Sequence, residues 1–269
     1  MSDFECNDPN VQRSDTQVPT LHAGQEPDAC DQTDYSESTN DNTAINVLEL
    51  YRSASPSVGT FRGETPVEGG ALVSTGSAFF AKDPTLPECT IVTANHLVSE
   101  HLFRNSVVMP DGQELTAFPM AQNAEKDIAL LKVLGVENPA QCGGLPLAQT
   151  GLGMNEGQGV AVVAPPAGTE VDFVSPGTVH KYATNSELTI NDEAPLADDQ
   201  LDPQHTMIRS KMNTIGGQSG GPLLDGQGSV RGVQIGSDLY EHSLATPVDD
   251  VRALSQQIDP VWFEDDGGN

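Results

Sequence analysis

The sequence predicts an all-β protein, either a sandwich or a pair of barrels. Short apolar runs typical of strands recur at close spacing, and Gly, Pro, Asp and Asn separate them. No long helical pattern alternates with these runs, which argues against a doubly wound α/β fold. The expected strands include residues 70–81, 90–93, 106–109, 128–133, 159–164, 172–174, 207–208 and 230–235.

The residues before the first expected strand differ from the rest. Residues 1–43 carry ten acidic side chains and one basic side chain. Their apolar residues follow neither the helical nor the strand period, so the segment cannot bury enough surface to offset the entropy of ordering it. We expect a disordered acidic leader or linker, then one domain over residues 44–258, and an acidic tail over residues 259–269.

Two short helices are expected, one at each end of the domain. Apolar residues recur at helical spacing from Ala44 to Tyr51, with Asn42 and Thr43 as candidate caps. A second helix is expected over residues 248–258, directly after a proline.

The charge balance of the chain limits which classes of molecule it can bind. The chain has 269 residues, with 12 Lys and Arg against 39 Asp and Glu, so its formal net charge is −27. This acid excess argues against nucleic acid and anionic membranes as partners, because contacts to phosphate need basic side chains. No apolar run approaches the roughly 20 residues that a membrane-spanning helix needs, so we expect no membrane insertion. The first residues also lack the basic start and apolar stretch of a signal peptide.

Nothing in the sequence indicates a metal or another cofactor, and we expect none. There is no Cys-x-x-Cys pair, and the histidines share no spacing with acidic residues that is typical of metal ligands. The acidic clusters lack the pattern of a dedicated calcium loop.

The four cysteines, Cys6, Cys30, Cys89 and Cys142, allow three disulfide pairings, and the sequence does not choose among them. We favour Cys89 with Cys142 and Cys6 with Cys30, which implies an oxidising compartment. Free thiols in a reducing cell remain the alternative.

The strongest local signal is the glycine-rich segment over residues 216–224, Gly-Gly-Gln-Ser-Gly-Gly-Pro-Leu-Leu. A serine hydroxyl is a poor nucleophile until a base takes its proton, and backbone N–H groups must face the developing oxyanion. Glycines permit the tight curl that this arrangement needs. We therefore expect Ser219 to be the nucleophile, with the N–H groups of Gly217 and Ser219 forming the oxyanion hole. The alternative is a plain glycine-rich turn between strands.

Two further segments favour the catalytic interpretation. His96 follows an apolar strand over residues 91–94, where a base is held rigidly at a cleft. Asp127 lies at the start of another apolar strand, where a buried carboxylate accepts the imidazole Nδ1–H and fixes the tautomer. Taken alone, each has a simpler interpretation: a structural histidine and a turn aspartate. The combination in the order His–Asp–Ser is much rarer by chance than any one of them.

These residues and their surroundings resemble the trypsin-like serine proteases of the chymotrypsin fold, and among these the HtrA/DegP group. The resemblance spans roughly residues 44–258. It implies two six-stranded antiparallel β-barrels, with the triad His96, Asp127 and Ser219 in the cleft between them, and hydrolysis of peptide bonds through an acyl-enzyme. The segments that carry it are 55–58 (SPSV), 76–80 (GSAFF), 93–96 (TANH), 111–112 (DG), 127–131 (DIALL), 165–168 (PPAG), 175–179 (SPGTV) and 245–248 (ATPV).

The sequence departs from that group at several points. Ala78 stands where glycine is more usual, and Ile-Gly-Gly-Gln over residues 215–218 replaces the usual Asn-Pro-Gly-Asn before the nucleophile. Residues 187–202, with six acids, look like an insertion that forms a regulatory loop or a solvated flap. We expect no PDZ modules after the protease-like part, and no Ile-Val-Gly-Gly segment marks an activation site. We therefore do not expect activation by propeptide cleavage.

The resemblance also implies which residues meet the substrate. Val233, Gln234, Ile235 and Gly236 would line the primary specificity pocket and pair with the substrate backbone as an added strand. Asn213 lies six residues before the nucleophile, where enzymes that cleave after Lys or Arg carry an acid. A basic side chain would therefore be buried without a counter-charge, so we expect a preference for small or medium apolar residues.

The expected function is that of a serine endopeptidase acting on unfolded or flexible segments of proteins or peptides. The alternative is a catalytically inactive, protease-like module that binds proteins. The resemblance to this family and the even number of cysteines favour a periplasmic or secreted location. Members of the family often form trimers, so the resemblance also implies that this chain could form a homo-oligomer.

Overall fold

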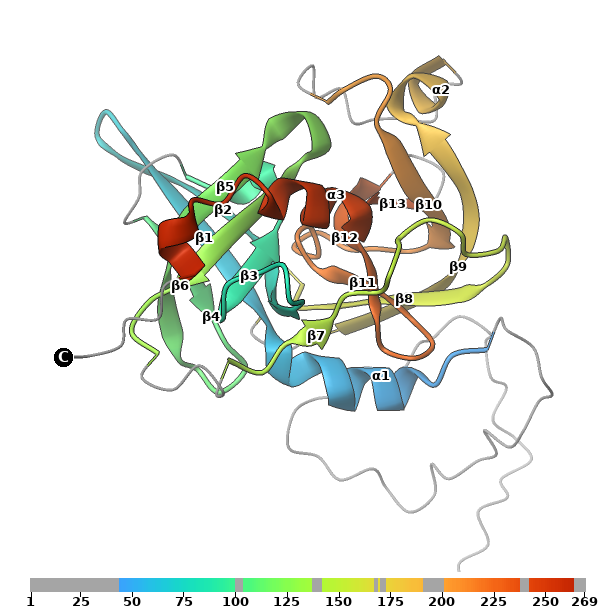
Figure 1. Ribbon diagram of the computed structural model, residues 1–269, viewed down its shortest axis with the longest axis horizontal. Helices are drawn as coiled ribbons and strands as arrows, with labels where there is room; N and C mark the ends of the chain where they lie inside the picture. Colours follow the sequence, from blue (N-terminus) through green and yellow to red (C-terminus); the bar gives the residue numbers. More distant parts are fainter. Residues whose placement is uncertain are drawn as a thin grey trace, which may run out of the picture. The chain divides into compact units, whose positions relative to one another are not determined.

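The computed structural model describes most of the expected domain (Figure 1). The predicted leader with Cys6 and Cys30, residue 172 of one expected strand, most of the acidic insertion and the end of the tail lie outside the described residues. None of the described helices is long and apolar enough to span a membrane. The described residues are 44–99, 104–136, 142–166, 169, 173–190, 201–237 and 242–263.

The first six strands form a closed antiparallel barrel. Its strand order is β1-β4-β5-β6-β3-β2, and pairing of β1 with β2 closes it. A short strand, β7 (Leu145–Pro146), adds to β2 in parallel. The six barrel strands are β1 (Val58–Val67), β2 (Gly70–Lys82), β3 (Thr90–Thr93), β4 (Asn105–Val108), β5 (Glu114–Asn123) and β6 (Ile128–Val133).

A second closed antiparallel barrel follows, with the strand order β10-β13-β12-β11-β8-β9. The two barrels confirm the predicted all-β architecture of two six-stranded barrels. The strands of the second barrel are β8 (Gly159–Ala164), β9 (Phe173–Thr184), β10 (Thr206–Met212), β11 (Pro222–Asp225), β12 (Val230–Ser237) and β13 (His242–Pro247).

Strand β6 shows why some strands are continuous apolar runs in the sequence. Ala129 and Leu131 pack in one hydrophobic cluster, whereas Ile128 and Leu130 pack in another, and both clusters include residues of the two barrels. All four side chains are fully buried. Because both faces of the strand are covered, alternation of apolar and polar residues is lost. The strand that follows Asp127 is therefore a rigid support for that residue.

Helix α1 (Val47–Ala54) starts later than the sequence predicted. Asn46, rather than Asn42 or Thr43, is the N-cap, because its side chain accepts a hydrogen bond from the Glu49 N–H at 3.1 Å. A 3-10 turn, η1 (Ser55–Ser57), leads from α1 to β1. A six-residue helix that the sequence did not predict, α2 (Asn185–Ile190), starts two residues before the region expected to be an insertion and runs into it.

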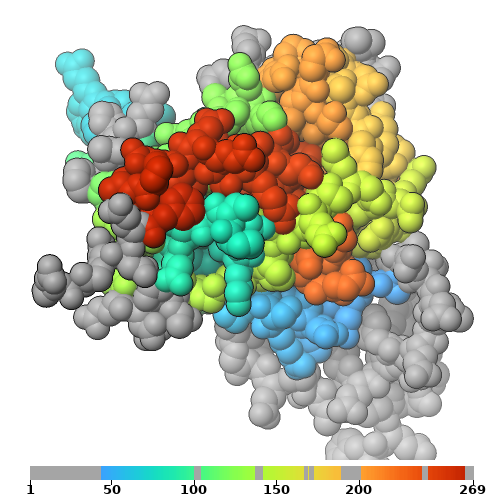
Figure 2. All heavy atoms as spheres, in the orientation of Figure 1, coloured from blue at the N-terminus to red at the C-terminus, as the bar shows by residue number. Residues whose placement is uncertain are grey.

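Helix α3 (Val248–Ser255) contacts β5 and β6 of the first barrel and β12 and β13 of the second. It therefore lies across the junction of the barrels, as Figures 1 and 2 show in red. The predicted helix was three residues longer. Arg252 of α3 forms an ion pair with Asp83 after β2, at 2.9 Å.

The predicted disulfide between Cys89 and Cys142 is confirmed, with a Cα–Cα distance of 5.4 Å. It joins the residue before β3 to the segment before β7. Since β3 leads directly to His96, the crosslink fixes the start of the strand that carries this residue.

Candidate active site

His96 and Asp127 meet at the ends of two paired strands of the first barrel. His96 lies in a 3-10 turn, η2 (Asn95–Leu97), directly after β3, and Asp127 precedes β6. The His96 Nδ1 atom is 2.7 Å from Asp127 Oδ2, and the His96 backbone N–H donates to Asp127 Oδ1 at 2.8 Å. The carboxylate therefore holds both the ring and the backbone of His96. The Asp127 side chain is buried, whereas the His96 side chain is 37% exposed.

Asp127 has a backbone conformation that non-glycine residues seldom adopt, with φ at +50°. It ends a 3-10 turn, η3 (Ala124–Lys126), whose start is capped by the Asn123 side chain through the Lys126 N–H at 3.0 Å. The Thr246 hydroxyl of the second barrel donates to the Lys126 carbonyl oxygen at 2.7 Å. The neighbouring turn and the other barrel thus impose the left-handed conformation that points Asp127 at His96.

A partly buried ionic cluster supports the same turn from α3. Lys126 forms an ion pair with Asp250, and His205 Nε2 lies 3.1 Å from the second carboxylate oxygen of Asp250. Burial by itself raises the pKa of Asp250, but hydrogen bonds and charge interactions with His205 and Lys126 outweigh it, so the pKa lies below the ordinary 3.8. Asp250 is therefore charged at neutral pH and ties the Asp127 turn to α3.

The segment around Ser219 is anchored to the first barrel by Ser77 of β2. The Ser77 N–H donates to the Ser219 carbonyl oxygen at 2.7 Å, and the Ser77 hydroxyl donates to the Gly217 carbonyl oxygen at 2.7 Å. The Ser77 carbonyl oxygen in turn accepts from Thr93 Oγ1 at 2.6 Å. Because Thr93 ends β3 and His96 follows three residues later, these bonds bring the serine segment to the strand end that carries the histidine.

Two glycines allow this close approach. A Cβ atom on Gly220 would lie 2.0 Å from the Ser77 carbonyl oxygen and 2.4 Å from Thr93 Oγ1, and Gly220 has φ at +86°. A Cβ atom on Gly76 would lie 2.8 Å from the Ser219 carbonyl oxygen. Glycine is therefore required on both sides of the contact between the barrels.

The turn before Ser219 has the geometry of a type II turn. The Gln218 N–H donates to the Ile215 carbonyl oxygen at 3.2 Å, and Gly217, the third residue of the turn, has φ at +99°. Within the described residues, neither the Gly217 N–H nor the Ser219 N–H donates to another protein atom. Ser219 Oγ donates a long hydrogen bond to the Ile235 carbonyl oxygen at 3.5 Å.

Strand β12 runs beside the serine segment. The Gly220 N–H donates to the Gln234 carbonyl oxygen at 2.6 Å, and the Gln234 N–H donates to the Gly221 carbonyl oxygen at 2.8 Å. The Ile235 carbonyl oxygen faces Ser219 Oγ, but Val233, Gln234 and Ile235 are all buried residues. Of the four residues expected to contact substrate, Gly236 alone is partly exposed.

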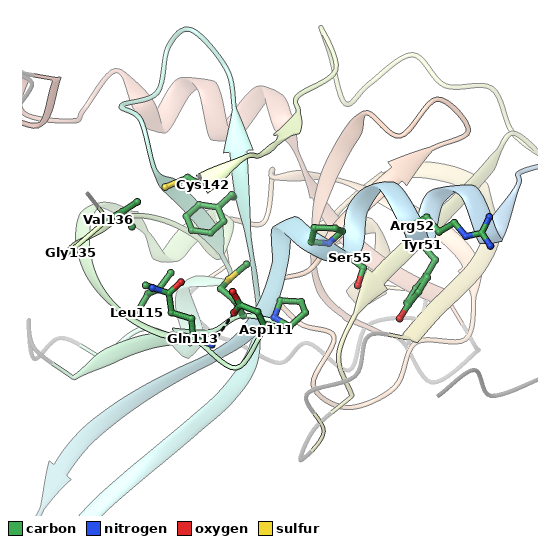
Figure 3. A pocket seen from close by; sticks show the side chains of 13 residues that line it. Tyr51, Arg52, Ser55, Asp111, Gln113, Leu115, Gly135, Val136 and Cys142 are labelled. Atoms are coloured by element: carbon green, nitrogen blue, oxygen red, sulfur yellow. Dashed lines mark hydrogen bonds between the residues drawn. The ribbon is translucent and has the colours of Figure 1, made fainter. Parts of the chain in front are cut away.

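A separate hollow of about 750 Å³ lies beside α1 (Figure 3). Tyr51, Arg52 and Ser55 line one side of it, and Asp111 lies on the opposite side. Cys142 of the disulfide also contributes to the wall. None of the residues expected to be catalytic lines it.

Sequence reasoning did not identify several residues that support the site. Ser77 belonged to a recognised motif but had no assigned role, and Gln218 was noted only as a departure from a family pattern. Thr246 lay in the recognised segment 245–248 but had no assigned role, and Asp250 gave no local signal. Both reach the Asp127 turn only through tertiary contacts.

Comparison with known proteins identifies the family. Residues 75–233, more than half of the chain, match the trypsin-like peptidase domain. Among solved structures, the Rv3671c protease from M. tuberculosis in its active form has a TM-score of 0.63 at 19% identity, over 92% of this chain and 94% of that one. The inactive form of Rv3671c protease has a TM-score of 0.60 at 20% identity, over 78% of this chain and 92% of that one.

The HtrA-type protease AlgW with a tripeptide has a TM-score of 0.60 at 19% identity, over 78% of this chain and 62% of that one. At these identities, the structural likeness establishes the shared fold. The family match goes further, since it runs from within β2 to within β12 and therefore covers the segments of His96, Asp127 and Ser219. The chain belongs to the trypsin-like peptidase family and is a serine protease, a hydrolase of proteins or peptides.

Proposed function

We propose that the chain is a serine endopeptidase in which His96, Asp127 and Ser219 form the catalytic triad. The observation that carries the proposal is the double contact of Asp127 with His96, at 2.7 Å to the ring and 2.8 Å to the backbone. A carboxylate that accepts the Nδ1–H leaves Nε2 unprotonated, so that His96 takes the proton of the Ser219 hydroxyl.

In the proposed reaction, Ser219 Oγ attacks the carbonyl carbon of the scissile peptide bond while its proton moves to His96 Nε2. The negative charge that develops on the carbonyl oxygen is stabilised by the N–H groups of Gly217 and Ser219. His96 then gives the proton to the leaving amine, and water hydrolyses the acyl-enzyme by the same steps in reverse. The lack of other acceptors for these two N–H groups among the described residues supports this role.

The substrate is proposed to pair with β12 beside the nucleophile. Gln234 pairs with Gly220 and Gly221, the Ile235 carbonyl oxygen faces Ser219 Oγ, and Gly236 is the next residue of the strand. A flexible segment that adds as a strand there would bring its carbonyl group to the serine. Asn213 is exposed and carries no charge, which supports a preference for small or medium apolar side chains before the cleaved bond. The Cys89–Cys142 disulfide supports a periplasmic or secreted location.

A library of unstructured peptides tests the proposal. We expect the chain to cleave inside these peptides, after small or medium apolar residues, and we expect Ser219→Ala to abolish cleavage. Asn213→Asp is the matched variant for specificity, because the added carboxylate should raise cleavage after Lys and Arg. A folded wild-type chain that binds the peptides without cleaving any of them would instead identify a binding module.

A further inference from the structure

The Gln218 side chain is a feature that the triad leaves unexplained. It is fully buried directly before the proposed nucleophile. Its Oε1 atom accepts from the Ile215 N–H at 3.0 Å and from the Ser175 hydroxyl at 2.9 Å, and its Nε2 atom donates to the Phe173 carbonyl oxygen at 3.5 Å. Because a backbone N–H only donates and a carbonyl oxygen only accepts, these partners fix the orientation of the amide.

The central residues of the turn that Gln218 closes do not by themselves define its conformation. Gly216 and Gly217 occupy its central positions, and a Cβ atom on Gly216 would meet nothing within 4 Å. Types I and II differ by a rotation of the central peptide, and two glycines accept either form. In the type II form observed here, the Gly217 N–H is left without a protein acceptor among the described residues, as an oxyanion donor must be.

We propose that Gln218 is the positioning residue of the oxyanion hole, since its buried amide ties the Ile215–Gln218 turn to β9 and so holds the Gly217 N–H toward the substrate. The inference rests on the proposed function of Ser219. Ser175 and Phe173 belong to β9, so Oε1 and Nε2 link both ends of the turn to a barrel strand. Ser77 secures the turn from the other side through the Gly217 carbonyl oxygen.

The amide is suited to this task because it donates and accepts without carrying a charge. Two acceptor bonds to Oε1 and one donor bond from Nε2 give each polar atom of this buried side chain at least one partner. Loss of these bonds would leave the Ile215 N–H and the Ser175 hydroxyl without their acceptor and free the central peptide to rotate.

The test compares three variants of the whole chain by steady-state kinetics on one peptide substrate. Gln218→Met keeps the approximate length of the side chain and removes both polar ends. Gln218→Glu keeps the acceptor for Ile215 and Ser175. Tyr182→Phe is the control, because the Tyr182 hydroxyl fixes a loop of the same barrel through the Met154 N–H at 2.8 Å and belongs to no part of the proposed site.

We expect Gln218→Met to lower kcat by about 10- to 100-fold with KM changed by less than about threefold, because the turn acts on the transition state rather than on substrate binding. The fall in kcat relative to wild type should be smaller for Gln218→Glu than for Gln218→Met. Tyr182→Phe should lower the melting temperature while keeping kcat within about twofold of wild type.

A folded Gln218→Met variant with kcat close to that of wild type would overturn the inference. So would a Tyr182→Phe variant that loses as much of kcat as Gln218→Met, since the effect would then come from general loosening of the barrel. Failure of the proposed function has a different signature: wild type itself would not turn over substrate, and both proposals would fall.

Discussion

Replacement of Asp127 by asparagine tests how the acid directs the proposed base. The His96 backbone N–H, a donor, faces Oδ1, so the asparagine oxygen must take that position. The asparagine NH2 group is then left facing His96 Nδ1, where the carboxylate now accepts. Two donors cannot share that contact, so Nδ1 must lose its proton and Nε2 must gain one. His96 in that tautomer cannot accept the proton of Ser219.

The expected cost is large because the wrong tautomer removes the base and the missing charge removes stabilisation of the imidazolium. By analogy with the same substitution in another enzyme of this mechanism, kcat should fall by about 10⁴-fold, which corresponds to about 5 kcal/mol in the activation free energy. The assay is steady-state hydrolysis of a peptide substrate at neutral pH, with KM determined separately.

Asp225→Asn is the matched control for this experiment. Asp225 is also buried and also binds a side chain, Arg231, at 2.7 Å, but it lies at the end of β11 and has no contact with His96. The Asp225→Asn variant should be less stable than wild type but keep kcat within about threefold of wild type. A folded Asp127→Asn variant within about tenfold of wild-type kcat would refute the role of Asp127.

Three further predictions concern packing and stability. Gly220→Ala puts a Cβ atom 2.0 Å from the Ser77 carbonyl oxygen, so both the melting temperature and the peptidase activity should fall; an unchanged variant would disprove the close approach. Burial raises the pKa of Asp250, but its histidine and lysine partners lower it by more, so the net pKa is below the ordinary value. The charged carboxylate therefore stabilises the fold above about pH 4, and this contribution is lost on acidification. In urea unfolding, the gap between wild type and Asp250→Asn should therefore shrink as the pH falls, and a widening gap would contradict this. Replacing Cys89 and Cys142 by serine should lower the free energy of unfolding by about 4 kcal/mol for a separation of 53 residues, and a loss below about 1 kcal/mol would show that the crosslink adds little.

The strands that the sequence predicted best are those buried on both faces. β6 and β8 are continuous apolar runs, and their bounds agree with the prediction. β5 was missed because it contains Pro119 and ends in polar residues, features that argue against a strand. The structure accommodates the proline at an irregularity in the pairing with β6, between Pro119 and Ala121.

The site was predictable where chemistry is local and was not where it depends on tertiary contacts. Ser219 was identified from the glycines around it. The structure explains why residue 220 must be glycine: a Cβ atom there would clash with the Ser77 carbonyl oxygen. The bond from Ser77 to Gly217 spans 140 residues of sequence, and the bond from Thr246 to Lys126 spans 120. No local pattern marks such partners, because any serine or threonine in a strand looks the same in the sequence.

The most direct test of the account is the rate at which a fluorophosphonate probe modifies the chain, with the modified residue located by mass spectrometry. The account predicts an adduct on Ser219 in wild type, no adduct in Ser219→Ala, and labelling slowed by at least about 100-fold in His96→Ala. Labelling of another residue, or labelling of Ser219 that proceeds equally fast without His96, would contradict the claim that this histidine activates this serine.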